Sequence, residues 1–321
     1  GVRILVPLGR SKTYTAVALN THDIQPDFEV KDIVDVLDDH PMLLPHQLSL
    51  WQWISYYYLA PIGDVYTAAM PSGLKAEDGF RPKTEDYIAL SPQLQDQRAL
   101  HVAMQQVFAT YLQMSHWDMR ADGEKVEVRE ITREELRNES NATEAIIKAL
   151  VDRHLLYIYK VEVGRLNDGV GEPLAQPKTL SPAQAHAYDA VVASMKEREV
   201  TLLHGVTSSG KTEVYIHLIA RALEEKKQVL YLVPEIALTV QMMERLRRVF
   251  GSRLGIYHSK YSDAERVEIW RKQLSDHPYD VILGARSAVF LPFTRLGMVI
   301  IDEEHESSFK QQDPSPRSHA R

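Results

Sequence analysis

Residues 205–212 read Gly-Val-Thr-Ser-Ser-Gly-Lys-Thr, which completes the pattern GxxxxGK[ST]. Gly205 and Gly210 allow backbone N–H groups to converge on an anion without a side chain in the way. The apolar run 200–204 predicts a strand entering this loop, and residues 213–223 predict a helix leaving it. Strand, glycine-rich loop and helix in this order form a phosphate-binding loop, which constrains the surrounding fold to an α/β sheet.

Each residue type in the loop has a chemical task. The ammonium group of Lys211 is expected to reach the β- and γ-phosphates of a nucleotide, and the hydroxyl of Thr212 to bind Mg²⁺. The pattern therefore predicts a site for ATP and Mg²⁺. Its predicted members are Gly205, Thr207, Ser208, Ser209, Gly210, Lys211 and Thr212.

A second motif follows further along the chain, where residues 298–301 are apolar and residues 302–305 read Asp-Glu-Glu-His. An acidic residue at the carboxyl end of a buried strand lies where open α/β sheets place their ligands. Asp302 is expected to hold Mg²⁺, and Glu303 to act as base toward the attacking water or to orient it. His305 is assigned a role in coupling, because the whole four-residue string is present.

One upstream residue joins the nucleotide site by its position. Residues 180–184 read Leu-Ser-Pro-Ala-Gln, in which Ser181 is a suitable N-cap and Pro182 suits the first helical position. The amide of Gln184 carries a donor and an acceptor side by side, which suits the edge of adenine. We therefore expect Gln184 to contact the base; a solvated glutamine is the plainer alternative.

Composition limits the class of protein. The 321 residues include no cysteine, so disulfides and cysteine-ligated metal are excluded within them. The formal net charge of −7 argues against a protein that coats nucleic acid by bulk attraction, so any contact with DNA must be local. We find neither a signal peptide nor an apolar run of about 18 residues, which predicts a cytoplasmic protein without membrane contact.

Hydrophobic periodicity predicts three domains, with linkers rich in glycine, proline and charge at 75–92 and 164–178. Residues 1–75 form a small mixed β/α domain, and residues 92–165 show three helices followed by a β-wing, which is typical of a winged helix. Residues 179–321 alternate strands and helices as a RecA-like lobe with a parallel sheet does. The predicted fold class is α/β and multidomain. Strands of the lobe are expected at 201–204, 228–233, 253–258, 280–283 and 298–301.

The third helix of the predicted winged helix carries Glu144 and Asp152 against Lys148 and Arg153. Helices that read a DNA groove usually bring net positive charge to the phosphates. We therefore expect this helix to serve packing or phosphate contact rather than base reading. The chain as a whole starts inside a strand-like run and stops soon after residue 305, so we expect a part of a longer protein.

Several further segments resemble one helicase family. They read Leu-Val-Pro-Glu-Ile-Ala-Leu-Thr at 232–239, His-Ser at 258–259, Gly-Ala-Arg-Ser-Ala-Val-Phe at 284–290 and Ser-Phe-Lys-Gln-Gln-Asp at 308–313. Together with residues 302–305 they are similar to the superfamily-2 replication-restart helicases known as primosomal protein N′, or PriA. Residues 1–9 and 56–64 resemble the amino-terminal domain of that family, which recognises the 3′ end of a nascent strand at a fork.

The resemblance implies further site residues. Gly9 and Lys31 are expected to line the 3′-terminus pocket. Arg286 and Ser287 are expected to touch the single-strand backbone, which suits a guanidinium fork and a hydroxyl donor. Residues 309–312 and 317–321 correspond to a loop that couples DNA contact to hydrolysis in this family. From that loop we expect DNA contacts by Lys310, Arg317 and Arg321.

The resemblance also implies a function, namely an ATP-dependent 3′-to-5′ DNA helicase that recognises stalled forks and D-loops and initiates primosome assembly for replication restart. Expected partners are forks, D-loops, single-stranded DNA and a nascent 3′ end, with single-stranded-DNA-binding protein and primosome or helicase-loader proteins. The family's second motor lobe, with its arginine finger and zinc-binding cysteine cluster, has no counterpart in these residues. We therefore expect DNA and nucleotide binding with negligible hydrolysis, because a missing transition-state arginine accounts for about 10³ to 10⁵ in rate.

Two other classes remain open. One is another superfamily-2 translocase of repair or restriction, against which residues 56–64 and 232–239 argue. The other is a non-motor fork-binding module with a vestigial nucleotide site, against which the intact Lys211 and Asp302 argue.

Overall fold

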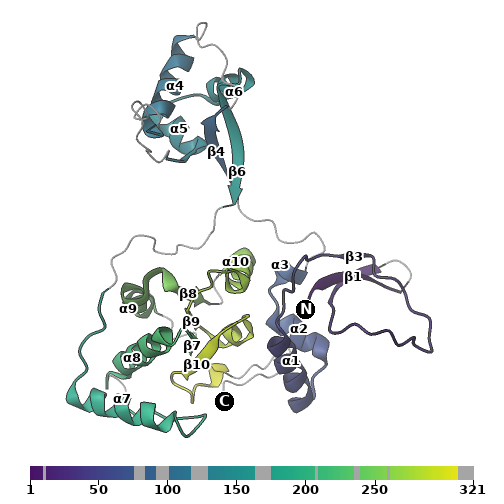
Figure 1. The fold of residues 1–321 in the computed structure, drawn as a ribbon, viewed down its shortest axis with the longest axis vertical. Coiled ribbons are helices and arrows are strands. Elements are labelled where there is room, and N and C mark those ends of the chain that lie inside the picture. Colours follow the sequence, from purple (N-terminus) through teal and green to yellow (C-terminus); the bar gives the residue numbers. More distant parts are fainter. Residues whose placement is uncertain are drawn as a thin grey trace. The chain divides into compact units, whose positions relative to one another are not determined.

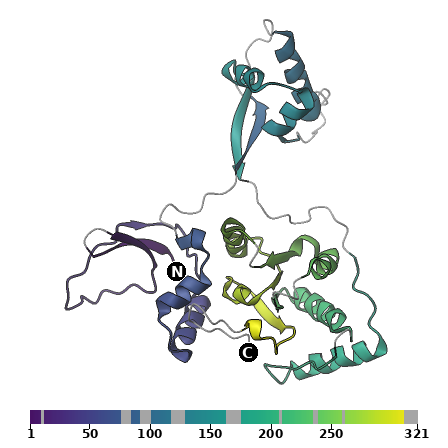
Figure 2. The same ribbon diagram turned by 180° about the vertical axis from the view of Figure 1, so that it is seen from behind.

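The structure is a computed structural model, and its described residues divide into two compact units. One unit comprises Gly1–Phe80 with Leu166–Arg321, and the other comprises Arg81–Arg165. Figures 1 and 2 show the fold from opposite sides. The described residues are 1–9, 12–75, 84–91, 101–116, 129–162, 175–206, 209–234, 239–258 and 261–309.

The chain begins with a three-stranded antiparallel sheet of order β2-β1-β3. β1 (Arg3–Leu8) pairs along its whole length with β2 (Lys12–Val17), and on its other side with the short β3 (Asp35–Val36). Arg3 is buried at the start of this sheet, where it pairs with Asp38 at 2.6 Å and donates to the carbonyl oxygen of Leu74 at 2.8 Å. Because a buried charge needs a partner, this arginine ties the sheet to the helices that follow. These helices are α1 (Pro45–Tyr57), α2 (Ile62–Ala69) and α3 (Ser72–Lys75).

The unit Arg81–Arg165 combines three helices with an antiparallel sheet of order β5-β4-β6. The two long strands pair from Thr84 opposite Glu162 to Leu90 opposite Leu156. Helices and sheet close over a core of their own, which includes Phe108. This is the three-helix and β-wing arrangement that the sequence predicts. Its elements are β4 (Thr84–Leu90), α4 (Val102–Met114), β5 (Ile131–Thr132), α5 (Arg133–Ser140), α6 (Glu144–Asp152) and β6 (Leu156–Glu162).

The prediction of a linker at 75–92 is wrong for residues 84–90, which form strand β4. Glu85 and Asp86 give this segment a polar appearance, but Ile88 is buried and the whole strand pairs with β6. Pairing with a strand far along the chain, rather than local composition, decides the structure here.

Residues 175–309 contain a four-stranded parallel sheet of order β10-β7-β9-β8, as predicted for a RecA-like lobe. Because parallel strands need crossover connections, helices alternate with strands along the sequence. The described part of the lobe also contains the short 3₁₀ helices η3 (Gly251–Arg253), η4 (Arg286–Phe290) and η5 (Ser307–Phe309). The main elements are α7 (Pro182–Ser194), α8 (Lys211–Glu224), β7 (Gln228–Leu232), α9 (Val240–Phe250), β8 (Leu254–Tyr257), α10 (Asp263–Leu274), β9 (Val281–Gly284) and β10 (Leu296–Ile301).

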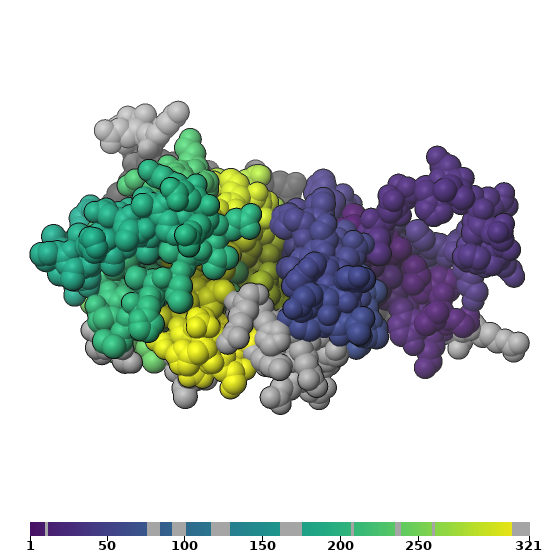
Figure 3. Space-filling model, turned by 90° about the horizontal axis from the view of Figure 1, so that it is seen from below, coloured from purple at the N-terminus to yellow at the C-terminus, as the bar shows by residue number. Residues whose placement is uncertain are grey.

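The two faces of this sheet belong to different cores. From β7, Val229 and Tyr231 join a cluster with α8 and α9, whereas Leu230 and Leu232 join a cluster with α10 and the helices α1 to α3. Side chains alternate across a strand, so a strand buried on both faces reads as one continuous apolar run. Helices from the first 75 residues therefore cover the second face of the sheet, and Figure 3 shows α1 and α2 beside the last described residues.

Polar contacts cross the same seam. The amide of Gln47 donates to the carbonyl oxygen of Phe290 at 2.7 Å. The indole N–H of Trp270 donates to the carbonyl oxygen of Met42 at 2.8 Å. The carboxylate of Asp263 accepts from the backbone N–H groups of Ser72 and Gly73. The seam is thus both apolar and specifically hydrogen-bonded.

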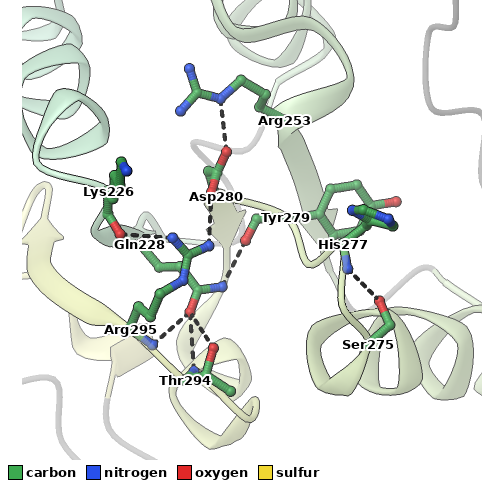
Figure 4. A network of polar contacts seen from close by, with 9 residues as sticks. All are labelled: Lys226, Gln228, Arg253, Ser275, His277, Tyr279, Asp280, Thr294 and Arg295. Carbon is green, nitrogen blue, oxygen red and sulfur yellow. Dashed lines mark hydrogen bonds and ion pairs between the residues drawn. The ribbon is translucent and has the colours of Figure 1, made fainter.

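A polar network joins the amino ends of the strands (Figure 4). The fully buried Gln228 accepts from the backbone N–H groups of Thr294 and Arg295 at 3.1 and 2.9 Å and donates to the carbonyl oxygen of Tyr279 at 2.8 Å. Asp280 pairs with Arg253 at 2.8 Å and with Arg295 at 3.4 Å. This edge lies opposite the carboxyl ends, where ligands bind in such sheets.

The strand predicted at 201–204 is wrong, because residues 201–206 have no regular secondary structure. Leu202 and Val206 in this stretch are exposed, as is the preceding Val200. A short apolar run becomes a strand only where it pairs, and among the described residues β10 pairs with β7 on one side and with no strand on the other. The other four predicted strands correspond to β7 to β10.

Candidate nucleotide site and DNA-contact residues

The phosphate loop ends at Gly210, which is the N-cap of α8. Its φ of 84° lies in the left-handed region, and a Cβ atom built there would lie 2.3 Å from Nε2 of Gln184. The positive φ favours glycine at this position, and a side chain there would also displace the amide of Gln184. Because glycine has no side chain to cap the helix, the N-terminus of α8 can present backbone N–H groups and partial positive charge to an anion.

Lys211 is held by two oxygen atoms. Its Nζ donates to the carbonyl oxygen of Gly205 at 2.9 Å and lies 3.4 Å from Oε1 of Glu303. Thr212 follows in the same helical turn and is half-buried. The structure thus brings together the predicted lysine of the loop and the predicted base of the second motif.

Asp302 follows the last residue of β10, and its backbone N–H donates to the carbonyl oxygen of Leu232 at 2.9 Å. Its Oδ1 accepts the N–H of Glu303 at 3.1 Å, and its Oδ2 accepts the hydroxyl of Tyr231 at 3.2 Å. Glu303 has a φ of 49°, a left-handed conformation that costs a non-glycine residue about 1 kcal/mol or more. The backbone turns sharply at the site.

Two tyrosines lie beside the carboxylate of Asp302. Tyr231 of β7 is fully buried, and Tyr215 of α8 meets it edge to face, with 5.6 Å between ring centroids. Burial raises the pKa of both hydroxyls, and the neighbouring carboxylate of Asp302 raises each pKa further. Both hydroxyls therefore keep their protons and can act as donors.

Gln184 lies on α7 beside the loop. Its Oε1 accepts the N–H of Ser181 at 2.9 Å in a capping box, and its Nε2 donates to the carbonyl oxygen of Gly210 at 3.3 Å. The amide thus joins α7 to the loop, and its contact with adenine stays a prediction. His305 is exposed, with Nε2 3.8 Å from Oε2 of Glu303.

An ion pair that the sequence analysis missed lies beside the loop. Glu213, the third residue of α8, is buried and pairs with Arg245 of α9. Because α9 follows residues 232–239, this pair joins the helix after that motif to the helix of the phosphate loop. Nothing in the local pattern distinguishes either residue from an ordinary solvated charge.

The residues expected to contact DNA fall into three groups. Lys31 donates from Nζ to the carbonyl oxygen of Gly9, so the structure brings the two expected pocket residues into contact. Arg286 and Ser287 lie in η4, and Nη1 of Arg286 donates to the carbonyl oxygen of Ser308 at 3.0 Å. Outside the described residues lie Lys310, Arg317 and Arg321 of the expected DNA contacts and Thr207 and Ser208 of the loop.

These residues fit a magnesium nucleotide. The oxygens of Gly205 and Glu303 occupy the ammonium group of Lys211 in the way that phosphate oxygens can. The carboxylate of Asp302 accepts the Tyr231 hydroxyl on one oxygen and the Glu303 N–H on the other, and a carboxylate has enough lone pairs to bind a metal ion or its water as well. Among the described residues, no group of three or more histidine, cysteine or acidic side chains could hold a metal ion.

The lobe has a glycine-rich loop at a helix N-terminus and, beside it, an Asp-Glu-Glu-His string at the carboxyl edge of a parallel sheet. This combination defines the motor lobe of a P-loop helicase. The family model of DEAD/DEAH box helicases matches residues 181–320, and the 3′ DNA-binding domain (3′BD) of PriA matches residues 1–71. The model described as winged helix domain, PriA helicase, Bacteroidota, matches residues 85–163. The chain belongs to the PriA family. The predicted fold class is thereby confirmed.

Relatives in the family carry the name replication restart protein PriA. That of Bacillus subtilis is 31% identical over the whole chain and 47% of its own length, and that of Haemophilus influenzae is 31% identical over the whole chain and 43% of its own. That of Synechocystis is 42% identical over 54% of the chain. The chain spans about half the length of the relatives that match it throughout. No helix within its described part is long and apolar enough to cross a bilayer.

Proposed function

We propose that this chain supplies the DNA-end-binding, winged-helix and first motor portions of an ATP-dependent 3′-to-5′ DNA helicase that restarts stalled replication. The approach of Lys211 to Glu303 within 3.4 Å supports the motor role most directly. It joins the two chemical motifs of an ATPase in one lobe, and that lobe belongs to a chain of the PriA family.

In the proposed site, Lys211 exchanges the oxygens of Gly205 and Glu303 for phosphate oxygens. Glu303 is then free to orient the attacking water and accept its proton. Thr212 and Asp302 hold Mg²⁺, which when bound neutralises charge on the phosphates. His305, next to Glu303, couples this chemistry to DNA contact.

DNA enters the proposal through the first domain and through η4. The contact between Lys31 and Gly9 supports a pocket for the 3′ end of a nascent strand, at forks and D-loops. Arg286 and Ser287 would contact the single-strand backbone, together with Lys310, Arg317 and Arg321. By family membership we also propose contacts with single-stranded-DNA-binding protein and with primosome or helicase-loader proteins.

For the 321 residues alone we propose weak nucleotide binding and negligible turnover. The family models that match include one motor lobe, whereas ATPases of this kind take a transition-state arginine from a second lobe, worth about 10³ to 10⁵ in rate. Strong DNA-stimulated hydrolysis by the purified chain would contradict this part of the proposal.

Fluorescence anisotropy with model forks tests the proposed function. At fixed salt, the chain should bind a fork whose leading strand ends in 3′-hydroxyl several-fold more tightly than one ending in 3′-phosphate. Lys31→Ala should remove the preference, whereas Lys196→Ala, which removes an exposed lysine of the motor lobe, should retain it. Equal affinity of the unmodified chain for both ends would favour a generic translocase lobe.

A further inference from the structure

We propose that Tyr231 is a positioning residue, whose buried hydroxyl fixes the carboxylate of Asp302 in the orientation that binds Mg²⁺. This inference rests on the proposed function, because it concerns the metal of the same nucleotide site. It concerns a residue in the middle of an apolar strand, to which the sequence motifs assign no role.

The register of the sheet directs Tyr231 toward Asp302. Tyr231 of β7 lies opposite Ile300 of β10, and both side chains belong to the cluster beneath α8. Asp302 is two residues beyond Ile300, so its side chain leaves the chain on the same face. A tyrosine ring on that face is long enough to bring its hydroxyl to the carboxylate, and the distance from Oη to Oδ2 is 3.2 Å.

Because Tyr231 is buried, its hydroxyl needs a partner within the protein. Tyr231 has no exposed surface, and a buried hydroxyl without a partner destabilises the fold. The carboxylate of Asp302 satisfies it, and the N–H of Glu303 holds the other oxygen at 3.1 Å. The Tyr231 hydroxyl and the Glu303 N–H thus hold different oxygens of the carboxylate, which sets its plane before a metal arrives.

A neighbouring ring fixes Tyr231 in turn. Tyr215 packs against it edge to face, with an interplanar angle of 72°. Tyr215 lies on α8 one turn after Thr212, the other expected metal ligand. The row Tyr215, Tyr231, Asp302 thus links the helix of the phosphate loop to the strand of the second motif, so the two expected metal ligands are held by one packed unit.

The test measures how the binding of a fluorescent ADP analogue to the 321-residue chain depends on Mg²⁺, starting from EDTA. Tyr231→Phe removes the hydroxyl and keeps the ring. The Mg²⁺ concentration for half-maximal effect should rise about ten-fold or more, because loss of a group that orients a metal ligand costs 10- to 100-fold in metal affinity. Affinity measured in EDTA should not change.

Tyr257→Phe is the matched control, since it removes another buried tyrosine hydroxyl of the same sheet, on β8. It should leave the Mg²⁺ dependence unchanged. In Asp302→Asn, adding Tyr231→Phe should have no further effect on that dependence, because the hydroxyl acts through the carboxylate. If Tyr231→Phe melts below the assay temperature, Tyr231→Met provides a second variant without the hydroxyl.

An unchanged Mg²⁺ dependence in a folded Tyr231→Phe variant would overturn the positioning role and leave only a contribution to stability. An additive effect of the two substitutions would overturn it as well. If the unmodified chain bound no nucleotide at any Mg²⁺ concentration, the proposed nucleotide site would fail and this inference with it. The two failures are distinct, because the first leaves binding by the unmodified chain intact.

Discussion

Lys211 combines two roles at the scale of single residues. In the structure its ammonium group closes the site by bonding Gly205 and Glu303, and in the proposed function it moves to the phosphates. The side chain is only 20% exposed, so its removal takes away some buried contact as well as the ammonium group. The larger loss should fall on nucleotide affinity.

Lys211→Ala should weaken nucleotide binding about 10- to 100-fold, which corresponds to a charge-assisted hydrogen bond of about 1.5 to 3 kcal/mol. Binding to a model fork should stay within about two-fold, an effect too small to matter energetically. Titration calorimetry and fork anisotropy on the same preparation check both values. Equal loss of both activities would mean that the lobe had unfolded or that the roles are not separate.

Glu135 is the residue at which a dependence on pH is expected. The backbone N–H of Thr132 donates to its carboxylate at 2.9 Å, and this bond, helped by the Thr132 hydroxyl and Arg129, lowers the pKa of Glu135 from its ordinary value of 4.5. A carboxyl with a depressed pKa stabilises the fold fully above its unfolded value. The contribution is lost as the pH falls through the folded value.

Glu135→Gln should therefore lower the stability of the Arg81–Arg165 unit at pH 7 by about 0.5 kcal/mol, a small value because solvent screens this half-exposed group. The difference from the unmodified chain should shrink below a pH of about 4. Thermal melts of the winged-helix transition at both pH values check this. Glu134→Gln, on the exposed side of α5, should show no such trend, and an equal deficit at both pH values for Glu135→Gln would assign the effect to geometry instead of charge.

At the scale of elements, the amino edge of the parallel sheet depends on one glutamine. Gln228 uses both ends of its amide to satisfy backbone groups before β9 and β10 (Figure 4). Substitution by leucine keeps the volume but leaves those groups without partners. Such losses rank among the most destabilising single changes.

Gln228→Leu should reduce the free energy of unfolding by about 3 kcal/mol, and Gln241→Leu, on the exposed face of α9, by less than about 0.5 kcal/mol. Urea denaturation of the 321-residue chain, followed through the transition of the unit that contains the helicase lobe, checks the comparison. Similar small changes in both variants would mean that water replaces the network.

The sequence predicts those elements whose chemistry lies in a local pattern. Lys211, Asp302 and Glu303 could be found because phosphate and metal chemistry demand their types at fixed spacing. Tyr231 and Tyr215 could not, since their role depends on which strand lies beside β10 and in what register. The predictions of a strand at 201–204 and of a linker over β4 are wrong for the same reason. Pairing with distant strands decides whether an apolar or a charged run becomes a strand.

At the scale of the whole molecule, the first 75 residues and the helicase lobe share one core. Leu43, Trp51 and Leu74 pack with Leu230, Trp270 and other residues of the lobe. The unit Arg81–Arg165, which the sequence inserts between them, has a separate core. Elements that share a core are expected to unfold together, and elements that do not can unfold separately.

The chain should therefore show two calorimetric transitions, with the first 75 residues melting together with the helicase lobe. Gln47→Leu removes the amide that bonds the carbonyl oxygen of Phe290 and the N–H of Leu44. It should reduce the free energy of unfolding of the shared unit by about 2 kcal/mol. Ile147→Val lies in the core of the Arg81–Arg165 unit. It should reduce the free energy of unfolding of that unit alone, by about 0.5 to 1.5 kcal/mol. Hydrogen exchange assigns each transition: in Gln47→Leu, protection should fall together in α1, α10 and β7. Loss confined to α1 would contradict the shared core, because the DNA-end domain would then open while the motor lobe stays folded.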